Sequence, residues 1–341
     1  MEQARPQFSF STRTCNWGII GLGNIAHKFA SDLAVLSHAR IHAVASRSLE
    51  KAIAFGRQYG ARHIYGNHED IVHCPDLDVV YIATPHVSHH GNTLHCLRNG
   101  LPVLCEKPLG INCRQVEEMV ATARDHDVFL MEALWTRFMP TIGKALELIE
   151  NRCIGDLLSI SADFGFRGNP LLKRRLYEPS LGGGALLDIG IYPVFLALLM
   201  LGQPAEVQAK AQFGQSGVDE EISMCFRYAH GPLAHLQASI RRQTRTEAFL
   251  HGSTGTLHIH SPWHGASAMN LLRRGEAPVS FHFDYEGEGY YLEAAHVMDC
   301  LARSRRQSDL LPLSFSRELI RLLDAIRHRA GIRYPGEPQT A

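Results

Sequence analysis

The sequence predicts an α/β protein of two domains, in which a doubly wound parallel sheet is followed by a second, sheet-rich domain. Three observations lead to this prediction. The chain has 341 residues with 45% hydrophobic content, more than one core usually organises. As far as residue 135, short β-branched runs alternate with helical patterns, as in parallel strands joined by right-handed crossovers. Beyond that residue, apolar and polar side chains alternate with a period of two, as in half-buried strands.

The first domain is expected over residues 16–135. Its predicted strands cover 17–20, 41–45, 79–83, 102–105 and 129–132, with helices over 24–36, 49–59, 88–98 and 113–125. The 15 residues before this domain are polar, carry Arg5 and Arg13, and lack the apolar run of a secretory signal. We therefore expect a flexible leader at 1–15.

The second domain is expected over residues 136–341. A helix at 141–151 precedes strands at 157–164, 206–212, 222–228, 233–239, 246–251 and 255–260, which have turn residues between them. A last helix is predicted over 316–328, and we expect it to pack back on the first domain. The fold class is thus a parallel α/β domain joined to a second domain with a sheet of its own.

The net charge and the length of the apolar runs indicate which kinds of partner the protein can bind. The 34 basic and 34 acidic side chains cancel, so the chain has no net field for nucleic acid or an anionic membrane. We expect no apolar run to approach the roughly 20 residues that span a bilayer, since 196–201 is only a short stretch. The sequence therefore predicts a soluble, cytoplasmic protein that acts on a small molecule, with neither nucleic acid nor a membrane as partner.

Cysteine and histidine are both frequent enough to raise the question of a metal. Eight cysteines occur without a CxxC pair in a chain too long to need disulfides, so we expect reduced thiols. Histidines cluster at His86, His89 and His90, and again at His258 and His260. No carboxylate or thiol completes a ligand set at helical spacing around them. We therefore predict no metal site and interpret these as ordinary surface or pocket histidines.

A glycine-rich turn follows the first predicted strand. Gly21 permits a tight turn, and Gly23 has no β-carbon to keep a pyrophosphate from the amino terminus of the next helix. Ala26 fills the third small position, where helix and strand pack closely. Such a motif is a weak signal alone, but here it lies in a strand–turn–helix of a βαβ unit, which predicts dinucleotide binding. The loop reads Gly21-Leu22-Gly23-Asn24-Ile25-Ala26.

The end of the second predicted strand distinguishes NADP from NAD. NAD-binding domains usually carry an acidic residue about 20 positions beyond the glycine motif, where it accepts hydrogen bonds from the ribose hydroxyls. This chain has Arg47 there, preceded by Ser46. A guanidinium and a hydroxyl suit a 2′-phosphate through charge-assisted hydrogen bonds. We therefore predict NADP in preference to NAD; the alternative is that Arg47 is a solvated loop residue.

Three further motifs complete the pattern. Thr84-Pro85-His86 follows the third predicted strand, Glu106-Lys107-Pro108 closes the fourth, and a glycine-rich segment at 182–192 lies in the second domain. Together with the glycine loop, they resemble the glucose–fructose oxidoreductase, inositol dehydrogenase and rhizopine catabolism (Gfo/Idh/MocA) family over nearly the whole chain. The segments 131–138 and 190–192 look most like the branch of that family that oxidises dihydrodiols and D-xylose.

The resemblance implies a fold, an assembly and a set of catalytic residues. It implies a Rossmann domain followed by an α/β domain with a large open, mostly antiparallel sheet, whose outer face commonly forms the interface of a homodimer. It also implies that Lys107 and Tyr192 flank the substrate oxygen beside the nicotinamide, with Asp188 near both. Many relatives have a histidine in place of Tyr192, so the tyrosine favours the dihydrodiol and glucose–fructose branches. The peptide bond before Pro108 is often cis in the family.

The proposed chemistry requires a proton relay at the substrate oxygen, because hydride transfer alone leaves an unstabilised alkoxide or ketone. A Lys107 ammonium would favour the Tyr192 phenolate and stabilise developing negative charge. Asp188 precedes Tyr192 by four residues, a spacing that places both on one face of an α-helix. Whether Lys107 or Tyr192 transfers the proton stays open. The alternatives are a core tyrosine with a satisfied hydroxyl and a solvated lysine.

The resemblance also implies the residues around cofactor and substrate. His86 and His89 would lie beside the nicotinamide ribose, or else be plain loop histidines; Trp135 would contact the substrate ring, or else pack in the core. The predicted cofactor-binding residues are Gly21, Leu22, Gly23, Asn24, Ile25, Ser46, Arg47, Thr84, Pro85, His86, His89, Glu106 and Lys107. The predicted substrate-binding residues are Trp135, Arg137, Phe164 and Tyr192.

These residues predict an NADP-dependent oxidoreductase that transfers hydride between nicotinamide and a sugar, such as an aldose like xylose, or a trans-dihydrodiol or other vicinal diol. One alternative is an NAD(P)-binding regulator without turnover, which the intact Lys107, Asp188 and Tyr192 argue against. A second is an NAD-dependent glycoside hydrolase or lyase that keeps its nucleotide bound through the reaction.

Overall fold

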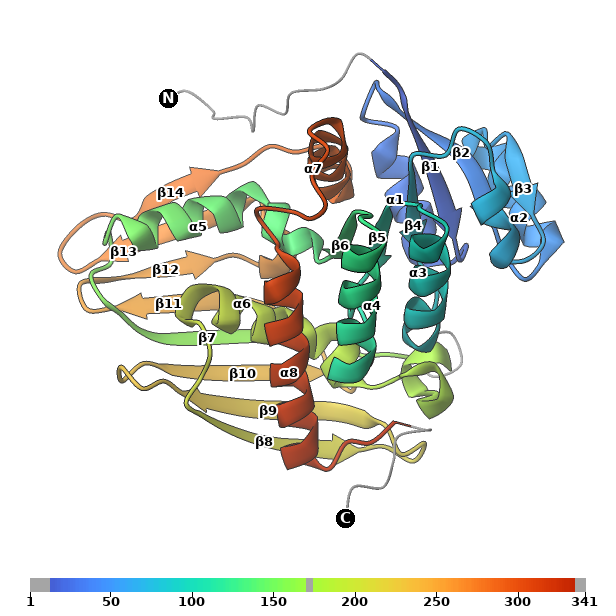
Figure 1. Ribbon diagram of the computed structural model, residues 1–341. Helices are drawn as coiled ribbons and strands as arrows, with labels where there is room; N and C mark the ends of the chain where they lie inside the picture. Colours follow the sequence, from blue (N-terminus) through green and yellow to red (C-terminus); the bar gives the residue numbers. More distant parts are fainter. Residues whose placement is uncertain (1–12, 170–173, 335–341) are drawn as a thin grey trace. The chain divides into compact units, whose positions relative to one another are not determined.

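The structure is a computed structural model that describes residues 13–169 and 174–334 (Figure 1). These residues form two compact units. Unit 1 comprises the described residues up to Leu109, Gln115–Trp135 and Glu286–Ser316; unit 2 comprises Gly110–Arg114, Thr136–Tyr285 and the described residues from Arg317 onward. Most of the leader predicted at 1–15 lies outside the described residues, and Cys15 already belongs to the first strand.

Unit 1 contains a parallel sheet of six strands, in the order β3-β2-β1-β4-β5-β6 (Figure 1). Every pairing within it is parallel, and its strand order reverses between β1 and β4. Open parallel sheets bind ligands at the carboxyl ends of the strands beside such a reversal. The predicted Rossmann sheet is confirmed. Its strands are β1 Cys15–Ile20, β2 Ala39–Ala45, β3 His63–Tyr65, β4 Val79–Ile82, β5 Val103–Glu106 and β6 Leu130–Ala133.

Helices connect these strands as predicted. They are α1 Asn24–Leu33, α2 Leu49–Tyr59, α3 His89–Arg98 and α4 Cys113–Asp125, with a short 3-10 turn, η1, at Glu69–His73. The α2 helix shows why the chain folds this way locally. Ser48 caps its start by accepting the N–H of Lys51 (3.3 Å), and Gly60 ends it in the left-handed conformation.

A late segment of the chain returns to unit 1. Glu286–Ser316, which the sequence analysis placed in the second domain, carries α7 Tyr290–Ala302 and belongs to unit 1. The Asp32 carboxylate accepts the backbone N–H of Tyr290 (2.7 Å), and the backbone of β6 pairs with Arg306 through the N–H of Leu130 (3.2 Å). These contacts join residues far apart in sequence, so local pattern gave no sign of the return.

Unit 2 contains a sheet of eight strands, in the order β14-β13-β12-β11-β7-β10-β9-β8 (Figure 1). All neighbours are antiparallel except β7 and β10, which confirms the large, mostly antiparallel sheet. The last two strands were absent from the prediction. The strands are β7 Leu157–Gly165, β8 Glu206–Phe213, β9 Asp219–Arg227, β10 Leu233–Ser239, β11 Ala248–Gly252, β12 Gly255–Ile259, β13 Ala268–Arg273 and β14 Val279–His282.

The helices of unit 2 include α5 Pro140–Glu150 and α6 Ile191–Leu201, and α6 packs against β7 and β10 on one face of the sheet. The segment Pro179–Leu201 is long and apolar enough to cross a membrane by length and composition, which corrects the expectation that no run approaches that length. However, 83% of its most apolar window is buried within the protein. The buried core helix of a soluble protein can be equally long and apolar, so this segment is only weak evidence for a membrane span.

The last predicted helix is present as α8, Leu313–Ala330. Most of it, from Arg317 onward, belongs to unit 2. The chain passes from unit 1 to unit 2 at Gly110, returns at Gln115, and passes to unit 2 again between Trp135 and Thr136, close to the boundary predicted near residue 135.

Candidate functional site

The glycine loop lies between β1 and α1 in unit 1. Gly21 has a φ of +88°, and a β-carbon there would lie 2.8 Å from the backbone of Ala83, at the end of β4. A β-carbon on Gly23 would meet nothing within 4 Å, and the start of α1 has no side-chain cap. The first N–H groups of α1 are therefore available to an anion, which fits the pyrophosphate of a dinucleotide. Ala26 is fully buried, whereas Leu22 and Ile25 are half-buried and Asn24 is exposed.

The end of β2 lies beside this loop, because the N–H of Gly21 donates to the carbonyl of Ala45 (3.1 Å). Ser46 is buried, and its hydroxyl accepts the N–H of Ser48 (3.2 Å), which shapes the turn into α2. Arg47 is exposed, and its guanidinium has no hydrogen-bond or ion-pair partner among the described residues. The arginine is thus positioned at the strand end and available to a phosphate.

The end of β4 and the end of β5 are joined by His89, the first residue of α3. This histidine is fully buried; its Nε2 lies 2.9 Å from the carbonyl of Thr84 and its Nδ1 lies 2.8 Å from the carbonyl of Pro108. His89 therefore bridges the two loops that the sequence assigned to the cofactor. His86 is also buried, and its ring lies 5.7 Å from that of His89. The positions of Thr84 and Pro85 thus depend on a buried side chain.

Lys107 follows β5 and is half-buried. Its peptide bond with Pro108 is cis, as the family resemblance implied. Glu106, the residue before it, is buried and accepts a hydrogen bond from the hydroxyl of Tyr81. Burial raises the pKa of Tyr81 well above its usual value, and the nearby charge of Glu106 raises it further. The lysine therefore stands at the edge of a buried polar cluster.

Two more carboxyl groups belong to this cluster. Glu132 of β6 is buried and accepts the N–H of Leu109 (2.8 Å); burial raises its pKa to about 7, partly offset by hydrogen bonds and the charge of Lys107. Glu293 of α7 is fully buried, and burial together with Glu106 raises its pKa well above its usual value. Glu293 was not predicted as a site residue, because it lies almost 190 positions from Glu106 and its sequence signal is only a single acid in a largely apolar helical run.

Trp135 ends unit 1. Its indole is buried and lies 4.8 Å from the ring of Tyr290 in α7, so one face of the tryptophan packs within the unit. Arg137 lies in the same 3-10 turn, Trp135–Phe138, and is half-buried. Trp135 therefore packs in the core of unit 1 on at least one side, in line with the alternative to substrate contact.

The predicted catalytic residues of the second domain lie at the start of α6. Asp188 belongs to a π-helical segment, Leu186–Gly190, and Tyr192 is the second residue of α6. The expectation that a four-residue spacing places them on one α-helical face is therefore corrected, because the turn between them is wider than an α-helical turn. Single π-helical turns within helices are frequent at functional sites. Tyr192 is buried, and Asp188 is largely so.

Partners around these residues were not identified from the sequence. A guanidinium nitrogen of Arg175 lies 2.6 Å from Oδ1 of Asp188, which forms a part-buried ion pair. His264 stacks on Phe164 with ring centres 4.1 Å apart, and Tyr192 lies 5.6 Å from Phe164 and 5.3 Å from His264. The predicted substrate residue Phe164 and the predicted catalytic Tyr192 thus share one aromatic cluster. An arginine within an unpatterned loop and a histidine after a cis proline carried no sequence signal.

The glycine-rich segment before Asp188 depends on Asp219. Its Oδ2 accepts the N–H of Leu186 (2.7 Å), and a β-carbon on Gly184, where φ is +120°, would lie 2.0 Å from its Oδ1. Asp219 is fully buried, and burial raises its pKa to about 7, against the lowering effect of backbone N–H groups. Glycine is therefore required at position 184 so that a buried carboxyl can hold the start of the π-helical turn.

The predicted residues form two sets, one in each unit. In unit 1, the glycine loop, Arg47, Thr84 and Lys107 follow strands β1, β2, β4 and β5 at the carboxyl edge of the parallel sheet. In unit 2, Phe164, Asp188 and Tyr192 gather with His264 and Arg175. The first set is suited to hold a dinucleotide, and the second combines an aromatic surface, a phenol and an ion pair.

Comparison with known proteins identifies both parts of the chain. Residues 15–134 match the model of the oxidoreductase family with an NAD-binding Rossmann fold, and residues 142–258 match the GFO/IDH/MocA C-terminal domain. The chain is 35% identical over 335 residues to a trans-1,2-dihydrobenzene-1,2-diol dehydrogenase of Xenopus tropicalis, covering 94% of this chain and 99% of that protein. The human protein of the same name is 34% identical over 332 residues, with 94% and 98% covered.

Solved structures with the same fold include an aldose-aldose oxidoreductase and a 3-ketoreductase. An aldose-aldose oxidoreductase from Caulobacter crescentus, complexed with glycerol, is 25% identical, with a TM-score of 0.84 and coverage of 94% of this chain and 98% of that chain. KijD10, a 3-ketoreductase from Actinomadura kijaniata in complex with NADP, is 25% identical, with a TM-score of 0.83 and coverage of 93% and 98%.

Proposed function

Because the chain belongs to the Gfo/Idh/MocA oxidoreductase family, we propose that it is an NADP-dependent dehydrogenase of cyclic vicinal diols, either a trans-dihydrodiol or a pyranose sugar. Its membership makes it an NAD(P)-dependent oxidoreductase. The two substrates share adjacent hydroxyl groups on a six-membered ring. The aromatic cluster of Phe164, His264 and Tyr192 carries the proposal, because its ring faces can pack on an arene or on the C–H face of a sugar while the phenol reaches a hydroxyl.

The proposed cofactor is NADP, bound across the carboxyl edge of the parallel sheet. The glycine loop and the uncapped start of α1 would hold its pyrophosphate, and Arg47 with Ser46 would hold its 2′-phosphate. When bound, the nucleotide supplies the hydride acceptor. We expect further contacts from residues of the glycine loop and the start of α1 and from the ends of β4 and β5: Leu22, Asn24, Ile25, Pro85, His86, Glu106 and Lys107.

The proposed proton relay consists of Lys107, Tyr192 and Asp188. Tyr192 would accept the substrate hydroxyl proton at its phenolic oxygen as the hydride leaves the adjacent carbon, and the Lys107 ammonium would stabilise the negative charge. Arg175 would hold the Asp188 carboxylate ionised and oriented through their 2.6 Å contact. Solved structures of the related ketoreductase include variants in which a lysine is replaced by alanine and a tyrosine by phenylalanine, the same two residue types.

The experiment that tests this function is a substrate screen that measures NADPH absorbance. Purified protein is incubated with NADP⁺ or NAD⁺ and with trans-dihydrodiols, aldoses or anhydro sugars. Sustained reduction of NADP⁺ with at least one ring diol supports the proposal. Turnover without release of reduced nucleotide would instead indicate a glycoside hydrolase or lyase that keeps its cofactor. Nucleotide binding without any turnover across the screen would indicate a regulator.

We further propose that the protein is a cytoplasmic homodimer. The face of the eight-stranded sheet opposite α6 is hollowed over β7, β8, β9 and β10 by a groove of about 710 Å³, lined by residues such as Ser161, Gln208 and His235. All eight cysteines are free thiols, which suits a reducing compartment. Sedimentation velocity should give a dimer. Leu233→Arg, on the exposed side of β10, should shift it to monomer, whereas Leu49→Arg at an exposed leucine of α2 should leave it dimeric.

A further inference from the structure

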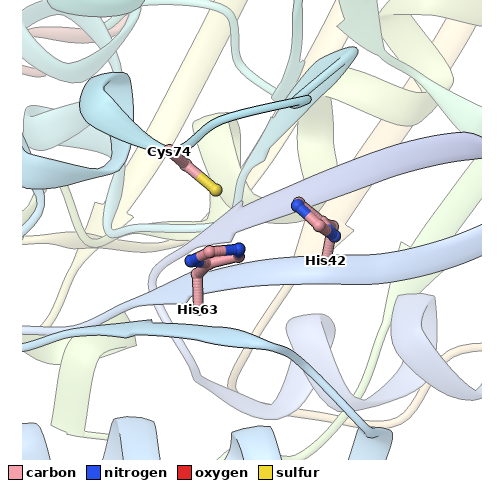
Figure 2. Close-up of side chains that lie close together, drawn as sticks. All are labelled: His42, His63 and Cys74. Atoms are coloured by element: carbon pink, nitrogen blue, oxygen red, sulfur yellow. The ribbon is translucent and has the colours of Figure 1, made fainter.

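We propose that His42, His63 and Cys74 bind a zinc-type transition-metal ion in unit 1, at a site separate from the cofactor and substrate residues (Figure 2). His42 lies within β2 and His63 begins β3, while Cys74 follows the 3-10 turn η1. The three residues thus come from three elements that occur in order within a short stretch of chain. Ligands carried by strands do not have the helical spacing by which a metal site is recognised within one helix.

The three side chains converge. One ligand atom of each lies within 4.8 Å of the others, and Figure 2 shows the Cys74 sulfur pointing toward the two imidazoles. The two histidine rings have centroids 4.8 Å apart. In the parallel register of β2 and β3, His63 is paired with Ala43, so His42 lies one residue before its partner. Around a tetrahedral zinc ion, ligands at about 2.0–2.3 Å are roughly 3.5 Å apart. Metal binding therefore requires side-chain movements of about 1 Å, which rotamer adjustments provide.

His42 is prepared to act as a ligand. It is buried within β2. Its Nε2 lies 3.1 Å from the carbonyl of Pro75, while its Nδ1 is buried and has no hydrogen-bond partner among the residues that the structure describes. A buried ring nitrogen without a hydrogen-bond partner destabilises the folded apoprotein. Metal binding would relieve this cost, because one ring nitrogen would coordinate the metal while the other donates to the carbonyl.

Cys74 supplies the soft ligand. It is buried, and a bound metal ion would take its sulfur as a thiolate, with the thiol proton released to solvent. The hydroxyl of Tyr65 in β3 forms a hydrogen bond with this thiol and is placed to donate to the thiolate once the metal binds. Asp76, whose charge reaches Cys74, adds a negative group near the cation. The exposed Arg62 opposes it at longer range.

The donor set determines the class of metal. Two imidazoles and one thiolate exclude calcium and magnesium, which take oxygen ligands, and favour zinc or copper. Three protein ligands leave a fourth tetrahedral position for water. His63 is half-buried and lies on the edge strand of the sheet, so we expect a water molecule to enter from its side. Occupancy would tie β2, β3 and η1 together, and because the ion binds only the folded state it would raise the melting temperature.

A second group of potential metal ligands, composed of one histidine, one cysteine and one aspartate, serves as an internal control. His296, Cys300 and Asp309 also lie within 4.8 Å of one another. There, however, the Nε2 of His296 lies 2.7 Å from the hydroxyl of Ser308, and Asp309 is paired with Arg305 at 2.6 Å. These groups are satisfied by one another, so they have less to gain from a metal. Cys300 therefore serves as a control cysteine in the same unit, and we expect it not to bind a metal ion.

The proposal is tested with Co²⁺ as a spectroscopic substitute for zinc, and with Zn²⁺ in calorimetry, on the full-length reduced protein. Wild-type protein should bind one equivalent of metal and show the near-ultraviolet thiolate-to-cobalt charge-transfer band. Cys74→Ser should abolish the band, and His63→Gln should weaken zinc affinity on the order of 100-fold. Cys300→Ser should retain both the band and the affinity.

Three results would overturn the proposal. These are no charge-transfer band in the wild type, a band that persists in Cys74→Ser, or a band that Cys300→Ser removes. Because His42 is buried, a His42→Gln variant is judged only if its circular dichroism matches the wild type; His63→Gln gives the histidine test independently of folding. Zn²⁺ should also raise the melting temperature of the wild type and of Cys300→Ser but not that of Cys74→Ser, a readout that does not depend on enzymatic turnover.

Discussion

Replacement of Arg47 by alanine should change which nucleotide the protein prefers. The arginine is exposed at the end of β2 and has no hydrogen-bond or ion-pair partner among the residues that the structure describes. Its removal should therefore leave the free energy of unfolding unchanged to within about 0.5 kcal/mol. The variant reports on binding alone, which makes it a sharp test of the cofactor assignment.

The magnitude follows from the contact that would be lost. A hydrogen bond to a charged group contributes about 1.5–3 kcal/mol, and each 1.4 kcal/mol is about tenfold in affinity. Because Arg47 is exposed, salt screens the contact, and we expect the lower part of that range. NADPH affinity should fall roughly 10- to 50-fold near physiological ionic strength. NADH has no 2′-phosphate, so its affinity should change less than about threefold.

The assay is fluorescence titration of NADPH and NADH into wild type and variant, repeated at low and high salt. The loss for NADPH should be larger at low salt, since the contact is electrostatic. Arg57→Ala is the matched control, because Arg57 is also exposed, in the last turn of α2, and should affect neither nucleotide. Equal losses for both nucleotides, or no loss for either, would refute the 2′-phosphate assignment.

Three further predictions follow from the two units. Tyr192→Phe should lower kcat by about 10²- to 10⁴-fold with nucleotide affinity unchanged, since only the proton relay is lost; unaltered kcat would make the tyrosine structural. Gly21→Ala should cost about 1–3 kcal/mol more in urea unfolding than Gly60→Ala, because both have positive φ but only position 21 meets backbone at 2.8 Å; equal costs would contradict this. Burial raises the pKa of Asp219 to about 7, so the folded state holds its proton above the pH at which the unfolded chain releases it. Stability should therefore fall as pH rises from about 4 to 7, and Asp219→Asn should reduce this fall in melting temperature, whereas an unchanged pH profile would argue against a protonated Asp219.

Sequence pattern predicted most of the fold because its signals are local. Alternating strands and helices, the glycine turn at Gly21 and a period of two beyond residue 135 are each contained within a few residues. The return of Glu286–Ser316 to unit 1 depends instead on contacts such as that between Asp32 and Tyr290, which are 258 positions apart. The π-helical turn before Tyr192 likewise depends on a distant group, Asp219.

Part of the candidate site could be predicted because some of its residues also lie in local sequence motifs. Arg47, Lys107 and Tyr192 lie in motifs of fixed spacing, so their positions could be inferred. Arg175 and His264 meet Asp188 and Phe164 only in the fold, and no motif connects them. The sequence prediction of no metal was based on helical spacing, and it stays a prediction that the cobalt experiment tests. Burial, which sets the pKa of Glu132 and Glu293, is also a property of packing that sequence spacing does not contain.

The central claim is that hydride passes directly between a ring carbon of the substrate and the nicotinamide of a releasable NADP. It is tested most directly by oxidising a diol deuterated at the reacting carbon with NADP⁺ and analysing the released nucleotide by mass spectrometry. The account predicts one deuterium on C4 of the nicotinamide for each product molecule formed. Released NADPH without deuterium, or deuterium returned to the product while the nucleotide stays bound, would contradict it.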